Sequence, residues 1–182
     1  MPEAYAARTM YNFFPGDHDM TGSELVSMYE FSYGAINRNL DGVTHEESLF
    51  IPEPAGNCIN WVLGHVVVAR NTILTLAGGA PIVSGDAATH YQRGSGPIHA
   101  GDKVLDLGTL RGLLADSQQQ LIPALAAISD ETLALPVPEE FRRPPLTGSI
   151  EAALARLAFH ESYHNGQIGL LRRLAGKPGA IA

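Results

Sequence analysis

Four stretches of the chain repeat apolar residues at intervals of three and four positions, which is the period of an amphipathic helix. No segment alternates apolar and polar residues as a half-buried strand does. The four stretches cover residues 21–40, 58–77, 107–128 and 150–174. Four amphipathic helices joined by loops predict an all-α, up-down-up-down four-helix bundle.

The boundaries of these helices are marked by residues that favour helix caps and helix ends. Candidate N-caps are Thr21 or Ser23 for the first helix, Asn57 for the second, and Thr147 or Ser149 for the fourth. Glycines at positions 42 and 78 end the first two helices. A connection over residues 44–56 contains one short turn, at residues 45–48.

Two further segments complete the predicted organisation. Residues 1–19 carry aromatic side chains without a helical or strand period, so we expect an N-terminal arm on a bundle domain that spans residues 20–182. Residues 82–105 form a long loop between the second and third helices. Because long loops without regular structure are often functional, this loop is predicted to form the lip of a binding pocket.

Charge argues against a nucleic-acid partner. The formal net charge is −7, and Lys103 and Lys177 are the only lysines of the 182-residue chain. No basic stripe is therefore present to contact phosphates. The arginine pairs at 142–143 and 172–173 are expected on the solvated surface, with the second pair also suited to the end of a helix.

Cysteine usage and hydropathy favour a cytoplasmic protein. Cys58 is the single cysteine, so no disulfide can form within the chain. We expect Cys58 to be a buried apolar side chain rather than a reactive thiol. The N-terminus lacks the basic and apolar regions of a signal peptide. The apolar run 59–69 is too short and too interrupted to span a membrane.

His160 and His164 carry the strongest chemical signal. Residues four apart on a helix lie about 5–6 Å apart at Cβ, so both imidazoles can bind one ion. His65 lies within the second helix, between the inward residues Val62 and Val66. In a four-helix bundle it can face the fourth helix and complete a three-histidine site with open positions for water, suited to zinc, nickel or ferrous iron. The alternative is that these histidines are hydrogen-bonded core or rim residues.

Other residues are weaker candidates. Tyr29 and Tyr33 are possible proton donors, and His90 and Tyr91 are possible pocket residues on the long loop. Gln167 is expected to contact either a ligand or the opposite helix. Solvent exposure is the better interpretation for Glu161 and for the remaining histidines, which are His18, His45 and His99. Gly166 is expected to allow close approach of a neighbouring helix.

Two sequence blocks resemble the DinB-like family, also described as DinB/YfiT-like metal-dependent enzymes. They are Asn60-Trp61-Val62-Leu63-Gly64-His65 and His160-Glu161-Ser162-Tyr163-His164-Asn165-Gly166-Gln167-Ile168. The tail 170–176 is also similar, and the resemblance covers about residues 20–176.

The resemblance implies a four-helix bundle that holds a divalent ion through His65, His160 and His164. The ion would be zinc or nickel, with iron or manganese as alternatives. Family members include thiol S-transferases and a thiol-dependent isomerase, and many form homodimers. We therefore expect an enzyme that transfers a low-molecular-weight thiol to an electrophilic small molecule. The alternatives are a metal-dependent hydrolase and a non-catalytic metal-binding stress-response protein.

Overall fold

The structure is a computed structural model that describes residues 20–98, 102–144 and 146–181. The elements in these ranges are helical, and the prediction of an all-α bundle is confirmed. They are α2 (Gly22–Leu40), α3 (His45–Ser48), α4 (Ile59–Leu76), α5 (Asp86–Thr89), α6 (Leu107–Ala127), α7 (Asp130–Ala134), the 3-10 helix η1 (Glu139–Phe141) and α8 (Ile150–Leu174). The predicted arm at 1–19, together with His18 and His99, lies outside the described residues.

Two of the four long helices, α2 and α8, begin at caps that the sequence indicates. Thr21 forms a capping box with Glu24 at the start of α2, and Ser149 accepts a hydrogen bond from the Ala152 amide at the start of α8. The cap predicted at Asn57 is wrong. Helix α4 begins after Cys58, which provides no side-chain hydrogen bond, so this helix depends on burial of its apolar residues instead.

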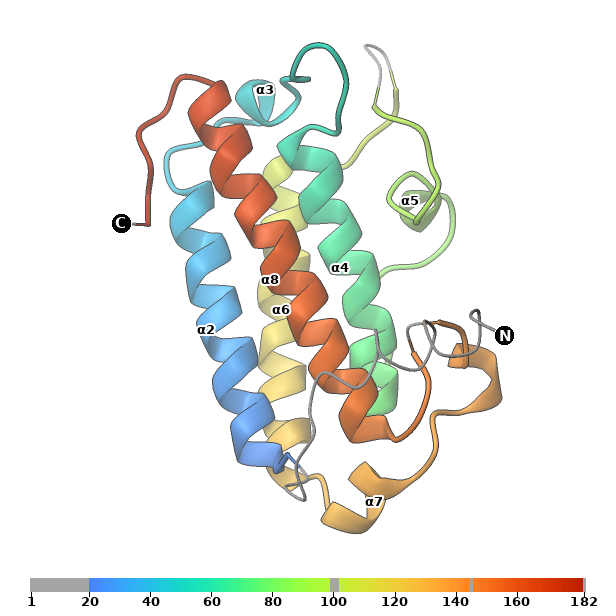
Figure 1. The fold of residues 1–182 in the computed structure, drawn as a ribbon. Helices are drawn as coiled ribbons and strands as arrows, with labels where there is room; N and C mark the ends of the chain where they lie inside the picture. Colours follow the sequence, from blue (N-terminus) through green and yellow to red (C-terminus); the bar gives the residue numbers. More distant parts are fainter. Residues whose placement is uncertain (1–19, 99–101, 145, 182) are drawn as a thin grey trace, which may run out of the picture.

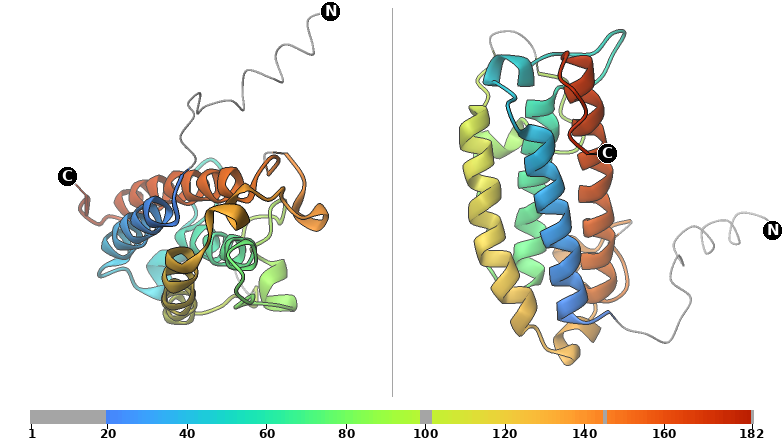
Figure 2. Two further views of the ribbon diagram at one scale, coloured as in Figure 1. Left: turned by 90° about the horizontal axis from the view of Figure 1, so that it is seen from below. Right: turned by 90° about the vertical axis from the view of Figure 1, so that its left-hand side faces the viewer.

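The four long helices do not alternate in direction, and this part of the prediction is wrong. Figures 1 and 2 show that α2 and α8 run one way while α4 and α6 run the other. The start of α2 lies beside that of α8, where the Met20 amide donates to Glu151 Oε1 at 3.1 Å. The start of α6 lies near the end of α2, where the Leu107 amide contacts His45 Nδ1 at 3.2 Å. The order is up-down-down-up.

The connection between α4 and α6 makes this order possible. An 18-residue helix such as α4 is about 27 Å long. The segment 77–106 is far longer than α4 when extended, so it can return along the whole bundle. Helix α6 therefore begins at the end of the bundle where α4 begins. This return segment includes α5, which lies beside α4 on the side away from α2 (Figures 1 and 2).

The bundle interior consists of two apolar clusters separated by polar side chains. One cluster includes Ile36, Leu63, Leu110 and Ile168, and the other includes Leu25, Ile73, Leu121 and Leu154. The buried polar side chains at this level come from all four long helices; they are Ser32, Arg70, Ser117, Gln118 and Glu161.

Helix α4 has the length and hydropathy of a marginal membrane span, with a mean hydropathy of 1.2 over 18 residues. However, 72% of this window is buried inside the bundle. Arg70 within the window is paired with Glu161 of α8. The apolar character of α4 is therefore explained by its position as a core helix.

Candidate metal centre

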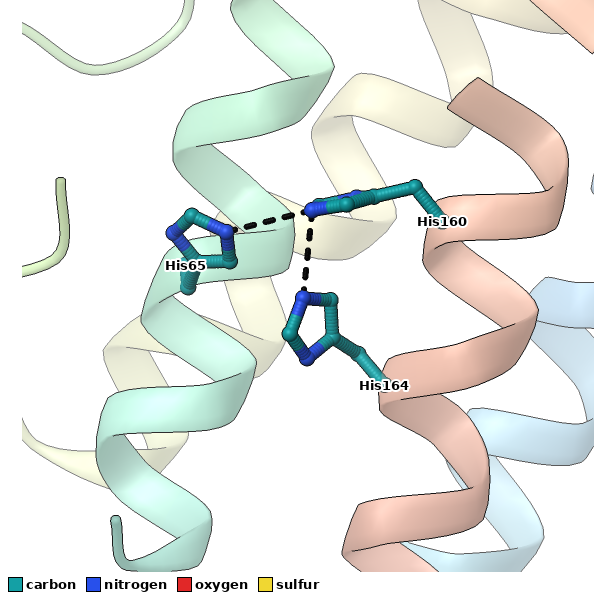
Figure 3. Close-up of side chains that lie close together, drawn as sticks. All are labelled: His65, His160 and His164. Atoms are coloured by element: carbon teal, nitrogen blue, oxygen red, sulfur yellow. Dashed lines mark hydrogen bonds between the residues drawn. The ribbon is translucent and has the colours of Figure 1, made fainter. Parts of the chain in front are cut away.

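Three imidazoles from two helices converge in the bundle (Figure 3). His65 projects from α4, and His160 and His164 project from successive turns of α8. His160 Nε2 lies 3.2 Å from His65 Nε2 and 3.1 Å from His164 Nε2. The ligand atoms of all three histidines lie within 4.8 Å of one another.

These separations fit one metal ion. Metal–nitrogen bonds of roughly 2.0–2.1 Å allow two ligand nitrogens of one ion to lie 3.1–3.2 Å apart. His65, His160 and His164 would therefore hold the ion, and three histidine ligands would leave positions for water or substrate, as in catalytic zinc sites.

Hydrogen bonds to the opposite ring nitrogens orient two of the three imidazoles. His65 Nδ1 donates to the carbonyl oxygen of Tyr91 at 2.7 Å, and His164 Nδ1 lies 2.7 Å from Gln167 Oε1. Each neutral ring then has a lone pair on Nε2 that points toward His160 Nε2. His160 Nε2 carries at most one proton and cannot satisfy both lone pairs, whereas a cation accepts all three. The donor set therefore fits a metal ion.

The electrostatic environment keeps these imidazoles neutral, which is the form that binds metals. Burial lowers the pKa of His65, His160 and His164. The pKa of His160 falls furthest, to about 4, first through burial and then through the nearby charges of His164 and His65. At neutral pH the site therefore requires no proton release from these rings before metal binding.

The lowered pKa values predict a pH-dependent stability of the metal-free protein. Below the ordinary histidine pKa of 6.5, the unfolded chain protonates the ring of His160, while the folded protein keeps this ring neutral down to about pH 4. The unfolded state then binds more protons, so the free energy of unfolding falls as the pH drops from about 6.5 toward about 4. Urea unfolding at several pH values measures this slope. A His160→Asn variant should show a shallower slope, and an unchanged slope would contradict the assignment.

Tyr91 attaches the long loop to α4 next to His65. Its hydroxyl donates to Asn60 Oδ1 at 3.0 Å and accepts from the Leu105 amide at 2.9 Å, and its ring lies against Gly64. These contacts fix the position of the Tyr91 carbonyl that orients His65. The structure thus places residue 91 of the loop beside His65 through its backbone, while a pocket lip formed by this loop stays a prediction.

Glu161 is buried, and its predicted position on a solvated helix face is wrong. Its carboxylate receives two hydrogen bonds from Arg70, at 2.9 Å from Nε and 2.7 Å from Nη2. Arg70 is 0% and Glu161 1% exposed. The second terminal nitrogen of Arg70 donates to Ser117 Oγ and Gln118 Oε1 on α6. Arg70, which was not predicted, therefore joins three helices beside the histidines.

Comparison with known proteins identifies the family and the fold of the chain. A family model described as the DinB superfamily matches residues 28–168. The chain belongs to the DinB superfamily. The crystal structure of a conserved protein from Enterococcus faecalis shares this bundle, with a TM-score of 0.64 and 19% sequence identity over 87% of this chain and 99% of that chain. That likeness shows the fold. No curated protein matches the sequence.

The other predicted site residues of this DinB-superfamily chain lie in different places. Tyr29 is fully buried and donates to the Leu154 carbonyl, so it is no pocket residue. Tyr33 lines a separate hollow between α2 and α6, and His90 is exposed on the loop. Gln167 Oε1 lies 2.7 Å from His164 Nδ1 on the same helix, and its contact with a ligand stays a prediction.

Two other expectations from the sequence have clear outcomes. Cys58 is buried, and burial raises the pKa of its thiol, as expected for an apolar core residue. Arg172, expected on the surface, is instead only 7% exposed, and it donates to the Asn39 carbonyl near the end of α2.

Close packing in this DinB-superfamily site occurs at Gly64 and not at Gly166, where the sequence suggested it. A Cβ atom at Gly64 would lie 2.1 Å from the Tyr91 ring, while Gly166 has nothing within 4 Å. We expect Gly64→Ala to lower the free energy of unfolding by roughly 1–3 kcal/mol through overpacking. Because the displaced Tyr91 orients His65, metal affinity should fall about 10–100-fold.

Gly166→Ala is the matched control for this prediction. The same change in the middle of α8 should be neutral or stabilising by up to about 1 kcal/mol, because Ala favours helix and meets no neighbour. Thermal unfolding and metal competition titrations measure both effects. Equal behaviour of the two variants would show that Tyr91 does not require the glycine.

Proposed function

We propose that this DinB-superfamily protein is a metal-dependent enzyme that transfers a low-molecular-weight thiol to an electrophilic small molecule. His65, His160 and His164 would hold the divalent ion, zinc or nickel in the first instance and iron or manganese as alternatives. This proposal is supported by the convergence of three Nε2 atoms, two of which belong to rings that hydrogen bonds at Nδ1 hold in place. When bound, the ion would supply the Lewis acidity that stabilises a thiolate at neutral pH.

The residues around the site have separate tasks in this proposal. The Tyr91 carbonyl and Gln167 hold two imidazoles in the tautomer that leaves Nε2 free. The Trp61 ring stacks on His65, with centroids 4.9 Å apart and planes 12° apart, and limits its rotation. His160 is only partly buried, which supports access of a small molecule from that side.

The position of Glu161 disfavours the hydrolase alternative. In metalloproteases with the spacing His-Glu-x-x-His, the glutamate acts as the general base that activates water. Glu161 occupies the corresponding position, but both its oxygens are bonded to Arg70 and its side chain is buried. It is therefore unavailable as a base, whereas thiol transfer does not require one once the thiolate has formed.

The proposal is tested by loading the purified protein with each metal and measuring consumption of a thiol in the presence of a chromogenic aryl halide. We expect turnover that a chelator abolishes and that His65→Ala lacks. A metal-loaded protein that consumes neither thiol nor aryl halide would contradict the transferase and favour a non-catalytic metal-binding protein. Hydrolysis of ester substrates without thiol would favour the hydrolase.

The remaining expectations about partners stay predictions. We expect a cytoplasmic homodimer that acts on a small molecule and has no nucleic-acid or membrane partner. Light scattering of the purified protein tests the dimer, and a mass equal to that of one chain would contradict it.

A further inference from the structure

Arg93 lies on a turn whose two ends contact the candidate metal centre. At one end, the Tyr91 carbonyl accepts the hydrogen bond from His65 Nδ1 at 2.7 Å. At the other end, Ser95 Oγ accepts from Trp61 Nε1 at 3.0 Å, and the Trp61 ring stacks on His65. Arg93 is therefore two residues from each point at which the loop contacts the site.

The turn itself is closed by its own hydrogen bonds. The Ser95 amide donates to the Gln92 carbonyl at 3.0 Å, and Ser95 Oγ donates to the His90 carbonyl at 2.8 Å. The backbone that carries Arg93 is thus held at the rim of the site. Because an arginine side chain extends several ångströms from its backbone, its guanidinium can reach a molecule bound at the histidines.

The charge of Arg93 acts on the histidines and is not paired with a carboxylate among the residues that the structure describes. Its positive charge contributes to the lowered pKa of both His65 and His160. Arg93 is exposed and forms no ion pair within the described ranges of the chain. Glu161, the carboxylate next to His160 in sequence, is instead paired with Arg70.

The local charge therefore differs in sign from that of the whole protein. The chain has a formal net charge of −7, yet neutral imidazoles, a divalent ion and Arg93 would make this site strongly positive. An unpaired arginine near a cation is repelled by it, and an anion between them would relieve this repulsion. A guanidinium is also well suited to bidentate binding of a carboxylate.

We infer that Arg93 binds the carboxylate of the small-molecule thiol whose sulfur would bind the ion held by the three histidines. The inference rests on the proposed function and adds the substrate class: a thiol that carries a negative charge a few bonds from its sulfur. Arg93 is accordingly a binding residue that determines specificity. The alternative is that Arg93 is a solvated surface side chain without a ligand.

The test uses cobalt(II)-loaded protein, because thiolate binding to this ion produces a charge-transfer absorption band that reports affinity without turnover. The probes are 3-mercaptopropionate, 2-mercaptoethanol and cysteamine, which pair the same thiol with a carboxylate, a hydroxyl or an ammonium group. We expect 3-mercaptopropionate to bind about tenfold or more tightly than 2-mercaptoethanol, from charge-assisted hydrogen bonds. Cysteamine should bind most weakly.

Arg93→Gln should reduce the preference for 3-mercaptopropionate over 2-mercaptoethanol to about the level that these thiols show for free cobalt(II). Arg93→Lys should restore part of this preference. Lys103→Gln is the matched control, because it removes one exposed positive charge from the same connection. It should leave the ratio of affinities unchanged. High salt should also reduce the preference of the wild-type protein and have little effect on Arg93→Gln.

The outcomes separate this inference from the proposed function. If the thiols bind but Arg93→Gln keeps the wild-type ratio, Arg93 does not bind the carboxylate and the inference is overturned alone. If 3-mercaptopropionate and 2-mercaptoethanol bind wild-type protein equally, it is likewise overturned. If no thiol produces the band although cobalt(II) is bound, the proposed function fails and the inference fails with it.

Discussion

The double variant His160→Ala, His164→Ala is expected to retain no stoichiometric metal. These residues supply two of the three Nε2 atoms, and His65 alone cannot replace them. Loss of an outer partner of a metal ligand costs about 10–100-fold in affinity, so loss of two ligands should exceed that range. Elemental analysis after dialysis and a competition titration with a chromophoric chelator measure the effect.

His90→Ala provides the control for this experiment, because it removes an exposed histidine from the long loop and leaves the site unchanged. It should bind metal as the wild-type protein does. Circular dichroism of the double variant should show intact helices, since removal of these two imidazoles does not remove the apolar core. Equal metal content in the double variant and the wild-type protein would refute the ligand assignment.

The position of the site could be predicted because it depends on local helix geometry. The spacing of His160 and His164 places both on one face of any helix. His65 lies in an apolar stripe beside Val62 and Val66, which fixes its direction toward the bundle interior. In a four-helix bundle, an inward histidine side chain on one helix is expected to contact a facing helix.

The direction of α6 could not be predicted in the same way. An amphipathic stripe has the same period whichever way the helix runs, so the pattern over residues 107–128 is silent on direction. A short connection would have forced α6 to run opposite to α4. The segment 77–106 is long enough to permit either direction, and the observed order depends on contacts between distant residues, such as that of Leu107 with His45.

The polar contacts behind the histidines were missed because they join residues that are usually exposed. A signal was nevertheless present in the spacing. Arg70 lies four residues after Val66 and three before Ile73, on the apolar stripe of α4. Glu161 lies at intervals of four and three between Leu157 and His164 on the seam of α8. Charged residues of opposite sign at inward positions of facing helices predict a buried ion pair.

Breaking that pair on one side is expected to cause a large loss of stability. Glu161→Leu would leave the Arg70 guanidinium, which is fully buried, without its carboxylate. Removal of one partner of a buried pair typically costs about 3–5 kcal/mol, because the remaining charge stays desolvated. That is a large fraction of the roughly 5–15 kcal/mol of a typical domain. Urea unfolding of the metal-free protein measures the loss without a contribution from metal binding.

Replacing both partners tests whether the loss comes from the orphaned charge. The double variant Arg70→Met, Glu161→Leu should recover most of the stability, since apolar replacement of a whole buried pair is often neutral or stabilising. The exposed pair Arg142–Glu139 is the control, and Arg142→Ala should cost about 0–1 kcal/mol. If Glu161→Leu is as mild as Arg142→Ala, water must reach the guanidinium and the pair is not desolvated. If the double variant is stable but binds metal weakly, the pair also holds α4 and α8 in the register that brings the three imidazoles together.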